Sequence, residues 1–154
     1  IQLLNVPFMV ALYPALSRIS TEDNNRLRKA VIKSLLFILA WSVPWSLLVS
    51  IFSPFLIPLI FGNKYDAAIP ILRFLIFFVP FASLSALLYK VLIILNKQKL
   101  YLYISIFGAV INFILNLIFI PKLNIMGAVF SSLATQLLLF IIYFIFVIIL
   151  IEKD

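Results

Sequence analysis

Two cationic side chains, Arg73 and Lys90, lie inside a long apolar segment of the chain. A charge in the hydrocarbon of a bilayer costs about 2.5–3.5 kcal/mol on insertion scales, so such a side chain normally faces a cavity or a partner. At helical spacing the two cations share one face, together with a proline and a serine. If this face lines a water-filled cavity, it attracts anions such as phosphate. The alternative is that each long side chain reaches back to the membrane interface along its apolar stem.

Two carboxamides, Asn112 and Asn116, are four residues apart, and Gly108 lies one turn earlier. They therefore form a small and polar stripe along one helix. In lipid, small residues at this spacing let helices approach closely, and amide side chains bond across the contact. We expect a membrane hairpin, in which this stripe packs on a second one formed by Gly127, Ser131 and Thr135. Contact with substrate hydroxyl groups is the alternative role for both asparagines and for Gln136.

The chain has no cysteine and no histidine, which excludes disulfides, thiolate nucleophiles and imidazole bases. Its acids all lie in loops or at the chain end: Glu22, Asp23, Asp66, Glu152 and Asp154. No two carboxylates can therefore meet in a membrane cavity, as glycosyl chemistry or metal-assisted hydrolysis would require. A glycine-rich phosphate loop is also absent. The sequence predicts no enzyme, no cofactor and no metal site.

The elements that position these residues are predicted to be transmembrane helices. Hydrophobic residues make up 66% of the chain and charged residues 11%, compared with about 45–50% and about 25% in soluble domains. We therefore predict an all-α, polytopic bundle that forms a single membrane unit over residues 1–154. Because Ile1 lies inside an apolar segment, we expect a fragment of a larger protein. The spans are expected at about 1–16 (in part), 34–60, 70–95, 100–120 and 126–151.

Prolines fall inside the expected spans at Pro44 and Pro80. Each is expected to kink its helix, either as a hinge for a conformational change or as a kink tolerated by packing. Pro121 is expected to open a tight break at Pro121 to Asn124, after which Gly127 leads into the last span. A capping box at Ser20 to Asp23 predicts a short surface helix that continues into span 34–60.

Basic residues are distributed unevenly among the loops, which predicts the topology. Lys64 and Lys122 are the basic residues of one side, and eight lie on the other: Arg18, Arg26, Arg28, Lys29, Lys33, Lys97, Lys99 and Lys153. The net charge of +7 is therefore attributed to topology, and no nucleic-acid partner is expected. The positive-inside rule places segment 17–33, segment 96–99 and the C-terminus in the cytoplasm.

Several short motifs in this order resemble the C-terminal part of a known transporter family. They are Tyr13 to Arg18 (YPALSR), Phe61 to Tyr65 (FGNKY), Leu95 to Lys99 (LNKQK), and the hairpin Asn112 to Ser132 with its asparagines, Ile-Pro break and Gly-Ala pair. The sequence resembles polysaccharide-biosynthesis or oligosaccharide (O-antigen-type) flippases. These belong to the multidrug/oligosaccharidyl-lipid/polysaccharide exporter superfamily, which also contains the multidrug and toxin extrusion proteins and the peptidoglycan-precursor flippases.

The resemblance implies a two-lobed transporter of about twelve to fourteen helices, with this chain as the last helices of the second lobe. Such proteins move a polyprenyl-diphosphate-linked oligosaccharide across the inner (cytoplasmic) membrane by alternating access. The expected partners are the bilayer, this lipid-linked oligosaccharide and the N-terminal lobe. Arg73 and Lys90, with Asn112 and Asn116, are the expected substrate-binding residues.

Two alternative functions remain open. A multidrug or cation antiporter of the same superfamily would need membrane-embedded acids in the rest of the protein. A membrane glycosyltransferase or polymerase would need acids on an outer loop, where only Asp66 qualifies.

Overall fold

The computed structural model describes residues 13–14, 16–20 and 24–153. The elements in this part of the chain are helices: α2 (Asn24–Phe61), the 3₁₀ helix η1 (Asn63–Tyr65), α3 (Ala68–Leu75), α4 (Phe78–Ile94), α5 (Gln98–Leu123) and α6 (Ile125–Lys153). Among the described residues, four segments are long and apolar enough to cross a membrane, with α3 and α4 counted as one. The predicted all-α, polytopic bundle is therefore confirmed. The first expected span, 1–16, falls mostly outside the described residues.

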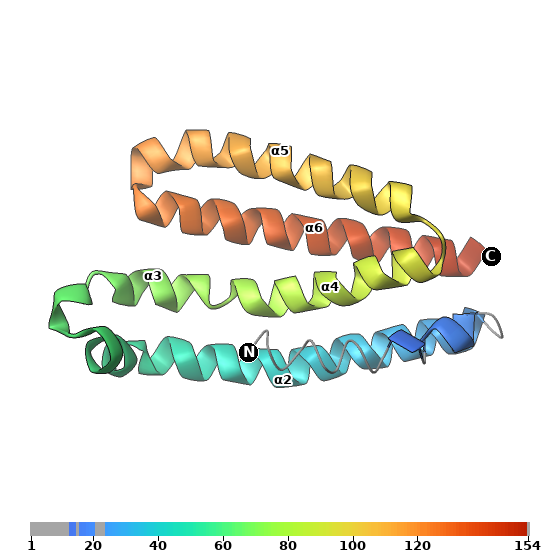
Figure 1. Ribbon diagram of the computed structural model, residues 1–154, viewed down its shortest axis with the longest axis horizontal. Coiled ribbons are helices and arrows are strands. Elements are labelled where there is room, and N and C mark those ends of the chain that lie inside the picture. Colours follow the sequence, from blue (N-terminus) through green and yellow to red (C-terminus); the bar gives the residue numbers. More distant parts are fainter. Residues whose placement is uncertain (1–12, 15, 21–23, 154) are drawn as a thin grey trace.

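The helices lie side by side in the order α2, α3 with α4, α6 and α5 (Figure 1). Short connections make successive spans antiparallel. As a result, the start of α2, the α4–α5 connection and the end of α6 share one end of the molecule (Figure 1). An ion pair between Arg28 Nη1 and Glu152 Oε1, 3.3 Å long, joins α2 to α6 there. The basic segments expected on one side of the membrane thus lie together in space.

A narrow apolar core joins α2, α4 and α6 near this end. Leu27 and Val31 of α2 are fully buried, together with Leu88 and Val91 of α4 and Val147 of α6. Large apolar side chains elsewhere on α2 and α5 are exposed. Such exposure is expected of helices that face lipid or further helices within a membrane.

Helix α2 is longer than the expected span 34–60, because the expected surface helix and this span form one continuous element. Its 38 residues reach about 57 Å, well beyond a hydrocarbon core of roughly 30 Å. Pro44 does not interrupt it. Pro54 provides no N–H for the carbonyl of Ser50, and the Ser53 hydroxyl donates to that oxygen instead, at 2.8 Å. The helix ends at Phe61, where Gly62 adopts a φ of 85°.

The expected single helix over 70–95 is wrong in one respect, because α3 and α4 are separated at Ile76–Phe77. The cause lies in Pro80, which has no N–H to donate to the Ile76 carbonyl. The chain tightens before it, and the Phe77 N–H donates to Phe74 O at 3.2 Å instead of to Arg73 O four residues back. Two carbonyls, those of Arg73 and Ile76, thereby lose their α-helical partners.

The hairpin between α5 and α6 is tighter than expected. The break was expected at Pro121 to Asn124, but α5 continues through Pro121 to Leu123 and α6 starts at Ile125. Proline fits a helical φ, so it is accommodated in the last turn of α5 at the cost of one hydrogen bond. Asn124 alone makes the turn, with a φ of 52°, a value that asparagine adopts more readily than most residues.

Candidate functional site

A line of polar side chains, here called the polar seam, runs along the contact of α5 with α6 and consists of Asn112, Asn116, Ser131 and Thr135. Asn112 Nδ2 donates to Thr135 Oγ1 at 3.2 Å across the two helices. Asn116 Nδ2 donates to Asn112 Oδ1 at 2.9 Å. The hydroxyls of Ser131 and Thr135 donate to carbonyls one turn earlier in α6. The predicted bonding between the two stripes is therefore present.

Two glycines let the helices approach closely enough for these bonds. A Cβ on Gly108 would lie 2.7 Å from a methyl group of Leu139 on α6. A Cβ on Gly127 would collide with the backbone carbonyl of Phe119 on α5. The first contact involves the flexible end of a side chain, and the second involves backbone. Gly127 is thus the more tightly constrained position of the predicted hairpin.

Gln136 connects α6 to α4. Its Nε2 donates to Ser85 Oγ at 3.0 Å and approaches the Phe81 carbonyl at 3.4 Å. A pocket of about 350 Å³ lies where the three helices meet, and its polar lining consists of amide and hydroxyl groups. It is lined by Phe78, Gly108, Ala109, Asn112, Ser132, Thr135, Gln136 and Leu139. We call this the polar pocket.

One acceptor of the polar seam has no partner. The Oδ1 atom of Asn116 is buried and accepts no hydrogen bond from the described residues. Asn116 also lines a separate, mostly apolar pocket of about 310 Å³ with Phe113, Leu117, Ile120 and Pro121. An unpaired buried carbonyl normally lowers the stability of the fold by about 1–3 kcal/mol. Such an atom is therefore a candidate acceptor for a hydrogen bond from a ligand or another part of the protein.

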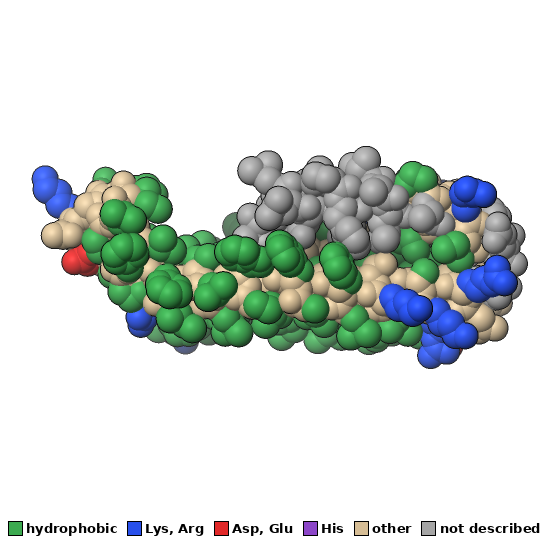
Figure 2. Space-filling model, turned by 90° about the horizontal axis from the view of Figure 1, so that it is seen from below, with side chains coloured by type: hydrophobic (Ala, Val, Ile, Leu, Met, Phe, Trp, Pro, Cys, Tyr) green, Lys and Arg blue, Asp and Glu red, His purple; other side chains and the backbone are tan. Residues whose placement is uncertain are grey.

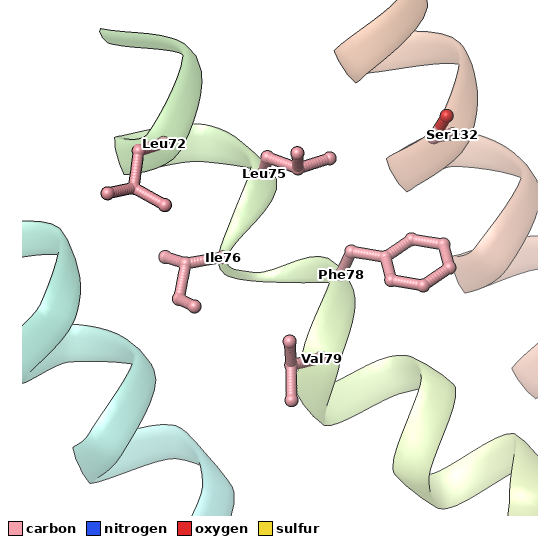
Figure 3. A pocket seen from close by; sticks show the side chains of 6 residues that line it. All are labelled: Leu72, Leu75, Ile76, Phe78, Val79 and Ser132. Carbon is pink, nitrogen blue, oxygen red and sulfur yellow. The ribbon is translucent and has the colours of Figure 1, made fainter. Parts of the chain in front are cut away.

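A third pocket, of about 480 Å³ and here called the apolar pocket, lies beside the helix break. Figure 3 shows its lining, in which the Phe78 ring extends from α4 towards Ser132 on α6. The lining residues are Leu72, Leu75, Ile76, Phe78, Val79 and Ser132. Phe78 and Ser132 also line the polar pocket. The sequence analysis missed both residues; Pro80, two positions after Phe78, was the available signal for a break here.

The two carbonyls that lose their α-helical partners at the break accept hydrogen bonds from α2, and Ile76 O also accepts the Val79 N–H at 3.1 Å. Ser50 Oγ donates to Arg73 O at 3.2 Å, and Ser46 Oγ approaches Ile76 O at 3.4 Å. Arg73 Nε in turn donates to Ser53 Oγ at 3.2 Å. Serines one turn apart on α2 thus hold α3 in place. We call this set of contacts the serine clamp.

The two cations predicted from the sequence lie on either side of the break. Arg73 is exposed on α3, and Lys90 is half-buried on α4. The regular helical spacing that assigned them to one face is interrupted at Ile76–Phe77. Neither cation lines the polar or the apolar pocket. The structure therefore joins Asn112 and Asn116 with Thr135, and leaves Arg73 and Lys90 apart from them.

Comparison with known proteins gives the family of the chain. The MatE family model matches residues 8–118. The membrane protein MJ1068 of Methanocaldococcus jannaschii, described as uncharacterized, is 28% identical over 100 residues, which are 65% of this chain and 20% of that protein. The match therefore covers about a fifth of that relative's length. No solved structure matches the chain. Because the family match extends over more than half of its residues, the chain belongs to the MatE family.

Proposed function

We propose that the protein containing this chain is a transporter that moves a polyprenyl-diphosphate-linked oligosaccharide across the cytoplasmic membrane by alternating access. The chain would contribute the last helices of the second lobe, with segments 17–33 and 96–99 and the C-terminus on the cytoplasmic side. Membership of the MatE family supports a transporter, and the motifs described above favour the flippase branch. The observation that carries the proposal is the chemistry of the polar groups between the spans.

These groups are amides and hydroxyls, and no carboxylate accompanies them in the described spans. Asp66 lies in the connection before α3, and Glu152 lies in the last turn of α6. A cationic drug or a coupling cation needs a carboxylate within the membrane. The polar pocket instead offers Asn112 and Gln136, whose amides both donate and accept hydrogen bonds, as sugar hydroxyls do. The unpaired Oδ1 of Asn116 is a further acceptor for a hydroxyl donor.

The diphosphate needs positive charge, which Arg73 and Lys90 supply in this proposal. The guanidinium of Arg73 has five N–H donors, and its contact with Ser53 uses only Nε–H. An arginine can therefore bind an anion and keep its position on the serine clamp. Lys90, half-buried on α4, is the second cation of the span formed by α3 and α4, and in this proposal it adds to the positive charge that faces the diphosphate.

The break at Ile76–Phe77 gives this movement a joint. Discontinuous helices form the binding sites of many transporters. An interrupted helix also lacks some of the backbone bonds that resist bending at that point. Here α3 is held to α2 by single hydroxyl bonds, and α4 is packed in the core with α6. Tilting of α3 against α4 would change the shape of both pockets, since Phe78 lines each of them.

Transport by the complete gene product in proteoliposomes tests the proposal. One assay follows translocation of a fluorescent polyprenyl-diphosphate oligosaccharide, and a second follows efflux of the cationic dye ethidium. We expect translocation without dye efflux, and we expect Lys90→Gln to slow translocation at least tenfold at an unchanged protein level. Lys64→Gln is the matched control, because it removes an exposed lysine from a turn without affecting the spans. Dye efflux without lipid translocation, or full activity of Lys90→Gln, would contradict the proposal.

A further inference from the structure

We propose that the first three turns of α2 form a binding surface for the headgroups of anionic phospholipids. The feature is a stripe of exposed cations, Arg26, Lys29 and Lys33, here called the basic stripe. Residues spaced by three and four lie on one side of a helix, so the stripe is continuous. This surface is independent of which substrate the protein transports.

The opposite side of the same turns fixes the direction of the stripe. Leu27 and Val31 have no exposed surface, and Leu35 is buried, all within the core shared with α4 and α6. The basic stripe must therefore be directed away from the bundle. The ion pair of Arg28 with Glu152 sets these turns level with the end of α6, where a span leaves the membrane.

The residues that continue the stripe along α2 indicate that the anion is a lipid. Phe37, one turn after Lys33, is 56% exposed, and Trp41 and Trp45 follow at 44% and 43%. The two indole rings lie 5.9 Å apart. This outward side of α2 thus offers cations first and apolar rings next, in the order in which a phospholipid offers its phosphate and its acyl chains. A soluble anion would have no use for the apolar part.

The charge distribution favours a negatively charged surface at this end. The segments 17–33, 96–99 and 152–154 hold eight cations and four acids, whereas the turns at the other end hold Lys64, Lys122 and Asp66. Figure 2 shows Lys and Arg side chains gathered at the end of the molecule where α2 begins. The positive-inside rule requires only that basic residues be present in a loop. It does not require them to form a stripe that continues into exposed aromatic rings.

Lipid binding to the purified complete protein tests this inference. The protein in detergent is titrated with phosphatidylglycerol, phosphatidylcholine or glycerol 3-phosphate, and the bound fraction is measured by native mass spectrometry. We expect preferential binding of phosphatidylglycerol. The double variant K29Q/K33Q should weaken it by roughly 30-fold, since each lysine near an anionic surface contributes about fivefold. The variant K29R/K33R, which retains both charges, should bind like the parent protein.

The matched control is K64Q/K122Q, which removes the same charge at the opposite end. It should leave the preference unchanged. An equal loss in this control would show that net charge alone matters, and would overturn the inference. Equal binding of phosphatidylcholine and phosphatidylglycerol would overturn it as well. Binding of glycerol 3-phosphate as tight as that of the lipid would assign the stripe to a soluble phosphate instead.

Discussion

The α5–α6 hairpin and the broken span α3–α4 use similar small polar residues for opposite purposes. In the hairpin, two continuous helices are joined by the side-chain bond from Asn112 to Thr135 and by glycine contacts. At the break, serine hydroxyls of α2 bond to the Arg73 and Ile76 carbonyls, which have lost their α-helical partners. The first arrangement fastens two intact elements together. The second supports an element that has been interrupted.

This difference indicates which part of the molecule can move. Separation of α5 from α6 would open a close backbone contact along with the polar seam. Displacement of α3 from α2 would break hydroxyl bonds that contribute on average about 0.6 kcal/mol each within membranes. We therefore expect the hairpin to behave as one rigid unit, and α3 as a jointed segment at the edge of the core.

The rigidity of the hairpin is tested most strongly at Gly127. Gly127→Ala puts a methyl group against the Phe119 carbonyl, which is backbone and cannot rotate away. We expect a loss of about 3 kcal/mol in the free energy of unfolding, as for overpacked cores, measured by denaturant titration in detergent. Gly108→Ala is the control, because the end of the Leu139 side chain can turn aside, and it should cost about 1 kcal/mol. Equal losses at the two glycines would contradict the proposed backbone contact.

The polar seam should contribute less than the close contact. Asn112→Leu removes the bond to Thr135 and leaves Asn116 Nδ2 without its acceptor. We expect a loss of about 1–2 kcal/mol, because a buried donor is left unpaired. A double-mutant cycle with Thr135→Val isolates the bond across the helices. A coupling energy near zero would mean that the bond from Asn112 to Thr135 does not stabilise the hairpin.

The sequence predicted the hairpin well and the broken span poorly, for a physical reason. The four-residue spacing of small and polar residues at Gly108, Asn112 and Asn116 is typical of close packing between membrane helices. The expected contact is present. Pro80 showed that a hydrogen bond is missing from the third span, as any proline does. It could not show whether the helix continues, as α2 does through Pro44, or separates into two. The bonds that the carbonyls at the break accept come in part from Ser46 and Ser50, which lie on another helix.

The same limit applies to the turn and to the cations. Pro121 signalled the end of α5, but whether the turn includes it depends on how closely α6 returns past Gly127. Arg73 and Lys90 were assigned to one face on the assumption of a regular helix between them. A sequence pattern gives the directions of side chains around the axis of one regular helix. It does not give those directions across an interruption that depends on neighbouring helices.

The smallest expected effect is that of the serine clamp, and it is the most informative about movement. Ser50→Ala removes the hydroxyl that donates to Arg73 O. We expect a loss of only about 0.5–1 kcal/mol in the free energy of unfolding. Relative to the parent protein, amide hydrogen exchange should accelerate more in α3 than in α4. Ser34→Ala is the matched control, since the Ser34 hydroxyl donates to the Ala30 carbonyl of its own helix, and it should leave α3 unchanged. Uniform acceleration of exchange across α3, α4 and α6 would mean that the break is not a joint, because the segments on its two sides would then open together.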